Sequence, residues 1–197
     1  WTFDEQAGQY YLHHFYSHQP DLNVQEPMVR QEIHEILGFW TQQGIAGFRM
    51  DAVPYVVDSR GGVEEQTITP HALLQDLRGF LQRRKGDSIL LGETNLPPEE
   101  VADYLRSEDE LQLAFNFHLN QHVFLAFARQ DPQPIREALA HLPSVPDAGQ
   151  WANFLKNHDE LTLDQLSPSE REEVFEAFGP EPDMQLFGRG IRRRVPT

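Results

Sequence analysis

Three short stretches decide the fold: Gly47-Phe48-Arg49-Met50-Asp51, Leu91-Gly92-Glu93-Thr94 and Phe154-Leu155-Lys156-Asn157-His158-Asp159. Each stretch places a carboxylate side chain at the far end of an apolar, strand-like run. In barrels of parallel strands, catalytic side chains gather at the carboxyl ends of the strands. One such carboxylate alone is usually a loop residue or a helix cap, whereas three in succession indicate a site.

Apolar residues at helical and at strand spacing alternate along the chain around these stretches. Most of the predicted helices open at or near a proline, and the predicted strands are short apolar runs. The predicted helices are residues 27–43, 70–81, 97–105, 118–129, 135–141 and 168–178, and the predicted strands are residues 45–53, 88–91, 111–117 and 150–155. Strands that alternate with helices imply right-handed crossovers and a parallel sheet.

Four strands are too few to close a barrel of eight, and an open half-barrel would leave unpaired strand edges. We therefore predict an α/β fold that is part of a (β/α)8 TIM barrel and spans residues 27–197. Residues 1–26, rich in aromatic residues and histidines, are predicted to be the end of an inserted domain. The sequence opens at Trp1 without an initiator Met or a signal-like segment and stops at Thr197 without a domain-closing element, so we interpret it as a piece of a longer protein. We expect that protein to be cytoplasmic.

Composition narrows the expected partners. The 197 residues include 16 basic and 31 acidic residues, a formal net charge of -15, and no cysteine. This charge repels the phosphate backbone of nucleic acids and anionic membrane surfaces, and no run approaches the ~20 apolar residues of a membrane span. We therefore expect no nucleic acid and no membrane partner. Without cysteine, disulfides, thiolate zinc sites and cysteine nucleophiles are excluded.

Paired carboxylates at strand ends are the chemistry that a retaining glycosidase needs. Such an enzyme uses two carboxyl groups about 5 to 5.5 Å apart, one as nucleophile and one as acid and then base. Asp51 and Glu93 end consecutive predicted strands. Arg49 points to the same side of its strand as Asp51, where its charge would keep Asp51 ionised. The alternatives are a structural ion pair between Arg49 and Asp51, and a helix-capping turn at residues 157–160.

In this order, the three stretches resemble the signature of the α-amylase superfamily, glycoside hydrolase family 13. The resemblance implies that Asp51 is the nucleophile that forms a glycosyl-enzyme ester and that Glu93 is the general acid/base. It implies that Asp159 holds the hydroxyl groups of the distorted sugar ring. His158 would bind sugar hydroxyls beside the scissile bond, with Arg49 next to the nucleophile. The visible strands would be about strands 4 to 7 of the family barrel.

Within the family, the chain is most similar to the trehalose synthase group, whose members isomerise maltose and trehalose. Residues 18–23, 47–55, 157–163 and 190–194 carry this similarity. Pro54-Tyr55 stands where many amylases have Lys-His, whereas the residues that flank Glu93 depart from the alanines usual in the group.

The expected function is therefore the isomerisation of maltose and trehalose through a covalent glucosyl-aspartate, with short α-glucans as further substrates. A hydrolase of the α-glucosidase or amylase type is the first alternative. A non-catalytic family member or an inactive fragment is the second.

Gln19-Pro20-Asp21-Leu22-Asn23 resembles a further family motif, which implies a structural calcium ion. Asp21 would ligate the ion together with the backbone carbonyls of Tyr55 and Val56, and Asp58 is a further candidate ligand. Hard oxygen ligands of this kind suit calcium. Asp21 could equally lie near a helix N-terminus without a metal. No organic cofactor is expected.

Three histidines, His13, His14 and His18, lie among aromatic residues in the first segment. Their spacing matches no known metal-binding helix motif, and no cysteine or second cluster completes a zinc site. They either flank a sugar-binding cleft or are surface residues. The sequence does not predict the oligomeric state.

Overall fold

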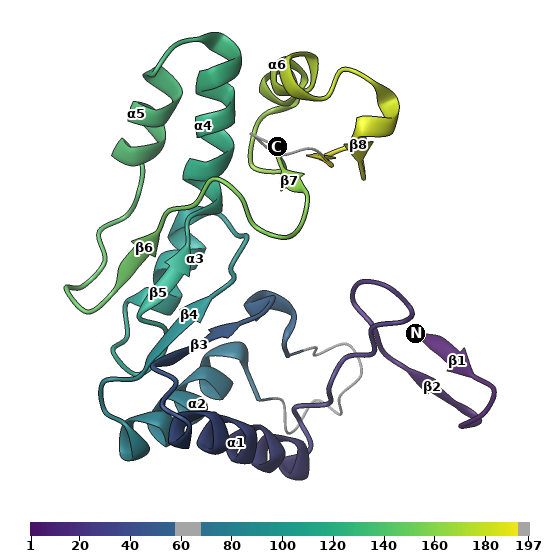
Figure 1. Ribbon diagram of the computed structural model, residues 1–197, viewed down its shortest axis with the longest axis vertical. Coiled ribbons are helices and arrows are strands. Elements are labelled where there is room, and N and C mark those ends of the chain that lie inside the picture. The colour runs from purple at the N-terminus through teal and green to yellow at the C-terminus, as the bar shows by residue number, and fades with distance from the viewer. Residues whose placement is uncertain (58–67, 193–197) are drawn as a thin grey trace. The chain divides into compact units, whose positions relative to one another are not determined.

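The computed structural model describes residues 1–57 and 68–192, and its chain divides into two compact units. The first unit is Trp1–Glu93 with Asp109–Leu111, and the second is Thr94–Glu108 with Gln112–Thr197. Figure 1 shows the helices and strands of each unit. Both units combine helices with a pair of parallel strands, which confirms the α/β class. The predicted boundary at residue 26 stays a prediction.

A parallel strand pair lies at the centre of the first unit. The elements of this unit are β1 (Thr2–Asp4), β2 (Gln9–Tyr11), α1 (Pro27–Gln42), β3 (Gly47–Met50), the 3-10 helix η1 (Val53–Tyr55), α2 (Pro70–Arg84) and β4 (Ile89–Gly92). Strands β1 and β2 form an antiparallel hairpin, whereas β3 and β4 are parallel neighbours. In their register Arg49 lies opposite Leu91 and Met50 lies opposite Gly92.

Local sequence explains where the helices of this unit begin and end. A proline occupies the first turn of both α1 and α2, where its missing N–H group costs no helical hydrogen bond. The Thr69 side chain accepts a hydrogen bond of 3.1 Å from the Ala72 N–H group and so caps α2. Gly44, at φ +95°, takes the left-handed conformation that turns the chain from α1 towards β3.

The core of the first unit is made of leucines on the packed faces of its helices and strands. Helices α1 and α2 pack against each other beside the strand pair (Figure 1). The fully buried side chains here are Val53, Leu73, Leu74, Leu77, Leu81 and Leu90. Each of these side chains is removed from water, and this burial stabilises the position of the strand ends.

The second unit combines a parallel strand pair with a helical layer and a small antiparallel sheet. Its elements are α3 (Pro98–Leu105), β5 (Leu113–Phe115), α4 (Phe117–Arg129), α5 (Gln133–Ala140), β6 (Gln150–Ala152), β7 (Leu161–Thr162), α6 (Pro168–Phe178), the 3-10 helix η2 (Pro182–Met184), β8 (Gln185–Leu186) and β9 (Gly190–Ile191). Strands β5 and β6 are parallel, and β7, β9 and β8 form an antiparallel sheet in that order. Helix α4 packs against α5 and α6.

Three of the predicted strands are too long. The predicted strand 45–53 spans only Gly47–Met50, because the backbone turns at Ala52 (φ 43°) and enters η1. The predicted strand 111–117 ends at Phe115, because the Asn116 side chain accepts a hydrogen bond from Leu119 N–H and caps α4. The predicted strand 150–155 ends at Ala152. Turn and cap residues thus end these strands earlier than their apolar pattern suggests.

The N-terminal hairpin and the antiparallel sheet of the second unit are not predicted from the sequence. Strands β7, β8 and β9 have two residues each, which is too short for a two-residue alternation to be recognised. The sheet is buried against α4 and α6 through one apolar cluster. Its members are Phe124, Leu125, Leu161, Leu163, Leu166, Val174, Phe175 and Ile191.

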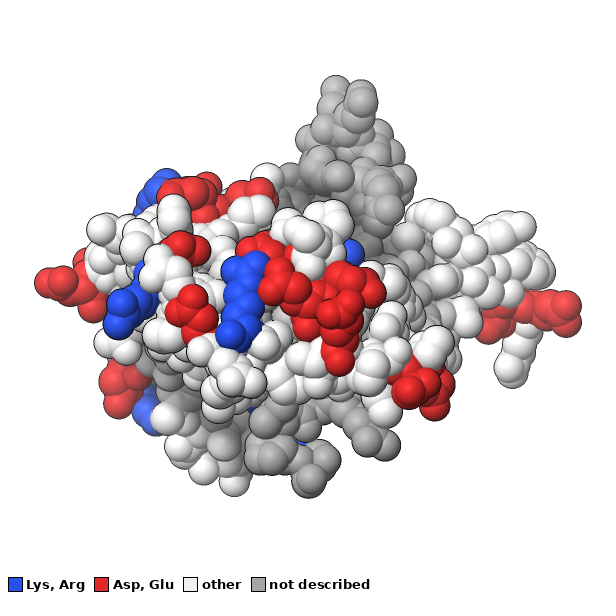
Figure 2. Space-filling model, turned by 90° about the horizontal axis from the view of Figure 1, so that it is seen from above, with Lys and Arg blue, Asp and Glu red and all other residues white. Residues whose placement is uncertain are grey.

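The surface reflects the acidic composition. Separate groups of Asp and Glu side chains lie on the face drawn in Figure 2, in keeping with 31 acidic against 16 basic residues. No helix within residues 1–57 and 68–192 is both long enough and apolar enough to cross a membrane.

Gly47 is expected to be necessary for the close approach of β3 to β4. A Cβ atom at this position would lie 2.5 Å from the Ile89 carbonyl oxygen, so Gly47→Ala must push the strands apart. We expect the free energy of unfolding to fall by about 1–3 kcal/mol, as for other overpacked sites. Urea denaturation of the full-length protein measures this loss.

Gly86→Ala is the matched control, because the nearest neighbouring atom, the Gln82 carbonyl oxygen, is 3.9 Å from the added Cβ atom. Equal destabilisation by both substitutions would contradict the steric explanation.

Candidate active site

The register of β3 and β4 places Asp51 and Glu93 side by side. Met50 and Gly92 are paired, so the next residue of each strand is an acid. The Glu93 N–H group donates to the Met50 carbonyl at 2.9 Å, and the Val53 N–H group donates to the Glu93 carbonyl at 3.0 Å. These two bonds fix the Glu93 backbone to the end of β3. The Asp51 and Glu93 carboxyl groups share a hydrogen bond.

Arg49 connects the two acids. Its Nη2 atom lies 2.8 Å from Asp51 Oδ1 and also donates a hydrogen bond to Glu93 Oε2. Arg49 and Asp51 therefore do lie on the same side of the chain, as their two-residue spacing predicts. One positive charge thus faces two carboxyl groups, which reduces the repulsion between them.

A strained residue follows Asp51. Ala52 has φ 43° and ψ 47°, a left-handed conformation that is uncommon for residues other than glycine. Its N–H group donates to the Glu93 carboxylate, and its carbonyl accepts a hydrogen bond of 2.8 Å from Tyr55 N–H. Strained backbone of this kind is concentrated at functional sites. In this conformation the Ala52 N–H group faces the Glu93 carboxylate.

The environments of the two acids differ. The Glu93 side chain is only 16% exposed, whereas that of Asp51 is 74% exposed. Burial raises the pKa of Glu93 to about 7, and the hydrogen bond and negative charge of Asp51 raise it as well. The Arg49 charge and the Ala52 N–H group oppose this shift. Near neutral pH Glu93 is therefore partly protonated and can supply a proton.

His158 and Asp159 lie in a loop of the second unit, six and seven residues beyond the end of β6 rather than at its tip. The Asp159 N–H group donates to Asn157 Oδ1 at 3.1 Å, and His158 Nε2 lies 3.4 Å from Asp159 Oδ2. The hydrogen bond from Asp159 N–H to Asn157 Oδ1 closes a local turn, which agrees with the alternative of a capping turn at residues 157–160. Both side chains are at least half exposed. Their predicted convergence with Asp51 and Glu93 stays a prediction.

Helix α4 holds the start of this loop through two asparagines. Asn116 Nδ2 donates to Asn153 Oδ1 at 3.1 Å, and Asn120 Nδ2 donates to the Phe154 carbonyl at 2.8 Å. Asn116 and Asn120 are both buried, so their amides are protected from competing water. The path of the chain towards Asp159 is therefore set by α4.

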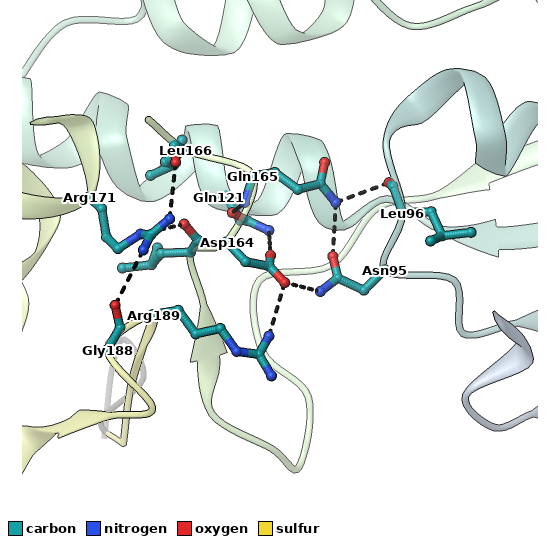
Figure 3. A network of polar contacts seen from close by, with 10 residues as sticks. Asn95, Leu96, Gln121, Asp164, Gln165, Leu166, Arg171, Gly188 and Arg189 are labelled. Atoms are coloured by element: carbon teal, nitrogen blue, oxygen red, sulfur yellow. Dashed lines mark hydrogen bonds and ion pairs between the residues drawn. The ribbon is translucent and has the colours of Figure 1, made fainter. Parts of the chain in front are cut away.

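A polar network in the second unit was not predicted from the sequence (Figure 3). The Asp164 carboxylate accepts hydrogen bonds from Asn95 Nδ2 at 2.8 Å, from Gln121 Nε2 at 3.0 Å and from Arg189 Nη1 at 3.0 Å. Gln165 Nε2 donates to Asn95 Oδ1 at 2.8 Å. Asn95 comes two residues after Glu93, and Asp164 comes five residues after Asp159. The network therefore joins the segments that follow two predicted catalytic residues.

The predicted metal ligands are only partly visible. Asp21 Oδ2 makes a hydrogen bond with His14 Nδ1, and the His14 ring lies 5.4 Å from the Tyr55 ring between centroids. Tyr55 and Val56 end η1, where the last carbonyl groups of a helix lack partners inside the helix. Asp58 lies outside the described residues. Within residues 1–57 and 68–192, the region around Asp21 included, no group of three or more His, Cys, Asp or Glu side chains is arranged to hold a metal ion.

The sequence predicts that Arg49 lies beside Asp51, but it does not predict contacts between residues that are far apart in the chain. His14 was not predicted as a partner of Asp21, because seven residues of loop carry no regular spacing. Asn95 and Asp164 are 69 residues apart, and neither lies in a pattern that points to the other. Only the adjacency of Asn95 to Glu93 offers a sequence signal for the network.

The chain is similar to a known family of catalytic domains and to several named proteins. A family model described as the α-amylase catalytic domain matches residues 1–173. The chain is 42% identical over 196 residues to a trehalose synthase of Thermus thermophilus, covering 99% of this chain and 20% of that protein. It is 40% identical over 199 residues to a trehalose synthase/amylase of Mycolicibacterium smegmatis, covering 99% of this chain and 33% of that protein.

Solved structures agree on the fold. A trehalulose synthase mutant matches with a TM-score of 0.64 and 28% identity, over 81% of this chain and 32% of that one. An α-amylase from H. orenii matches with a TM-score of 0.63 and 22% identity, over 85% of this chain and 32% of that one. The chain is thus an α/β segment of the TIM barrel found in amylase-family enzymes. It spans about a fifth to a third of the length of the curated relatives described above.

We expect Glu93→Gln to stabilise the protein more at pH 8 than at pH 5. In the folded protein Glu93 has a pKa of about 7, above its ordinary value of 4.5. Between these values the unfolded chain has lost a proton that the folded protein keeps, so stability falls as pH rises towards 7. Glutamine does not ionise, so it removes this cost. The difference in free energy of unfolding between the variant and wild type should therefore be larger at pH 8 than at pH 5, by on the order of 2 kcal/mol.

Urea denaturation of both proteins at the two pH values measures the difference. Glu5→Gln, an exposed residue beside the hairpin, is the control and should change stability equally at both pH values. A difference between Glu93→Gln and wild type that does not vary with pH would show that Glu93 ionises normally.

Proposed function

This chain belongs to the α-amylase family of catalytic domains, and we propose that the protein containing it is a retaining enzyme that acts on short α-glucosides. The observation that carries this proposal is the pair of Asp51 and Glu93, hydrogen-bonded to each other at the ends of two parallel strands, with Arg49 on both. Retaining glycosidases need this combination of one ionised and one protonated carboxyl group at short range.

Each acid has one role in the first half of the proposed reaction. Glu93 donates its proton to the glycosidic oxygen while an Asp51 oxygen attacks the anomeric carbon. The glycosidic bond breaks, a sugar leaves with the proton, and the glucosyl unit is bound to Asp51 as an ester. Burial of Glu93 supports its role as the acid, because its raised pKa keeps a proton available near neutral pH.

In the second half of the reaction, Glu93 acts as a base. It takes a proton from an attacking hydroxyl group, and the oxygen of that group displaces Asp51 from the anomeric carbon. If the attacking group is the anomeric hydroxyl of the released glucose, maltose becomes trehalose. If it is water, the product is glucose. Asp159 and His158 are proposed to hold the sugar hydroxyls during both halves.

We propose isomerisation of maltose and trehalose as the principal outcome. The 42% and 40% identities to proteins named trehalose synthase support it. Hydrolysis is the second candidate, since the chain is also 36% identical over 139 residues to a glucan 1,6-α-glucosidase of Streptococcus pneumoniae. The two outcomes differ in whether the site keeps glucose in and water out after the first bond breaks.

We also propose a structural calcium ion bound by Asp21 and the carbonyl groups of Tyr55 and Val56. All three supply oxygen donors, the donor type that calcium prefers. The contacts of His14 with Asp21 and with the Tyr55 ring support the proximity of the carboxylate to the end of η1. When bound, the ion would neutralise the Asp21 carboxylate and order the turn that follows the nucleophile.

The full-length protein incubated with maltose should produce trehalose, with glucose as a minor by-product. Glucose that remains beside the ester on Asp51 attacks it before water does. Chromatographic separation of the sugars measures the ratio. Glucose as sole product would make the protein a hydrolase, and the absence of any reaction with maltose, trehalose and short α-glucans would indicate a non-catalytic family member.

Asp51→Asn should abolish trehalose and glucose formation together, because both pass through the same ester. Asp4→Asn, in the exposed β1 strand, is the matched control and should keep both activities. Loss of only one product in Asp51→Asn would contradict a shared intermediate.

Removal of calcium should lower the melting temperature of the full-length protein. A bound ion stabilises the folded state in proportion to the logarithm of its free concentration over its dissociation constant. Melting is followed after treatment with chelator and after addition of either calcium or magnesium. Recovery with calcium at concentrations where magnesium has no effect is expected, and unchanged melting in chelator would rule the site out.

A further inference from the structure

His14 contacts two of the residues proposed to form the calcium site. Its Nδ1 atom makes a hydrogen bond with Asp21 Oδ2, and its ring packs at 53° against the Tyr55 ring. The His14 side chain is only 9% exposed, so its hydrogen bond with Asp21 is largely shielded from water. The neighbouring Phe15 ring adds an edge-on contact with Tyr55, at 5.7 Å between centroids. Two consecutive residues thus hold the Tyr55 ring.

The backbone brings His14 to Asp21 by closing a loop. The Asp21 N–H group donates to the Leu12 carbonyl at 2.9 Å, and the Tyr11 hydroxyl donates to the Ser17 carbonyl at 2.5 Å. These bonds fold residues 12–21 back on themselves, so that His14 faces the carboxylate of Asp21. The contact is therefore a consequence of the loop's own hydrogen bonds.

We propose that His14 is a positioning residue of the calcium site, which holds the Asp21 carboxylate beside the end of η1. This inference rests on the proposed calcium site. An ionised carboxylate only accepts hydrogen bonds, so His14 Nδ1 is the donor. A carboxylate has about four lone-pair positions, and the bond to His14 leaves positions for a cation.

The physical role of such a donor is to fix the ligand before the metal arrives. Groups that hydrogen-bond to metal ligands set their orientation, and their loss lowers metal affinity by about 10–100-fold. His14 acts on the site through its Nδ1–H group, which orients the Asp21 carboxylate. A calcium ion would then meet a carboxylate that is already oriented.

Two variants separate the N–H group of His14 from its ring. His14→Phe keeps an aromatic ring next to Tyr55 but cannot donate to Asp21. His14→Asn keeps an N–H donor close to the position of Nδ1 but has no ring. His18→Phe is the matched control, because it makes the same change of side chain in the same loop. His18 stacks on Tyr16, at 5.4 Å between centroids, and not on a proposed calcium ligand.

Calorimetric titration of calcium into the chelator-treated full-length protein gives the dissociation constant without any measurement of activity. We expect His14→Phe to raise this constant about 10–100-fold, and His14→Asn and His18→Phe to stay close to wild type. Wild-type affinity in His14→Phe would overturn the inference, and so would equal weakening in His14→Asn.

If the wild-type protein itself binds no calcium, the calcium proposal fails together with this inference, while the sugar products still test the catalytic proposal separately. A crystal structure of the wild-type protein grown with calcium gives a second measurement that does not depend on how the variants fold. Asp21 bound to calcium and to His14 Nδ1 together would support the inference. Asp21 bound to calcium but turned away from His14 would overturn it.

Discussion

The parallel register of β3 on β4 is the constraint on which the candidate active site depends. Because Met50 lies opposite Gly92, the two strands continue into Asp51 and Glu93. Neighbouring strands lie about 4.8 Å apart, close to the separation of about 5 to 5.5 Å between the carboxyl groups of retaining glycosidases. A shift of one residue in either strand would turn one acid to the opposite side. The register therefore places the two acids at neighbouring strand ends, within reach of one sugar ring.

Unequal burial then divides the two roles between chemically similar groups. Two carboxylates side by side repel each other, and Arg49 reduces this repulsion by contacting both. The cost of ionisation falls mainly on the more buried Glu93, whose pKa rises to about 7. Asp51 stays in contact with water and with Arg49. The difference between the proposed nucleophile and the proposed acid thus follows from where each side chain lies, since both acids occupy equivalent positions in the register.

The sequence predicts the parts of this structure that depend on local patterns. Prolines at first turns locate α1, α2 and α6, and the two-residue spacing of Arg49 and Asp51 places both on one side of β3. Strand ends were predicted poorly, because Ala52 and Asn116 end β3 and β5 through turn and cap geometry that hydrophobic patterns do not reveal. The hydrogen bond between Asn95 and Asp164 joins segments 69 residues apart, so it can be identified only once the fold is known.

The turn after β3 links the proposed nucleophile, Asp51, to the proposed metal site. Ala52 follows Asp51 directly, donates its N–H group to Glu93, and accepts the Tyr55 N–H group at its carbonyl. Tyr55 is in turn held by the His14 ring. A calcium ion at the end of η1 would therefore restrain the same short turn that aims Asp51 and the Ala52 amide. Because Ala52 is in a strained left-handed conformation, this restraint would help the folded state to maintain it.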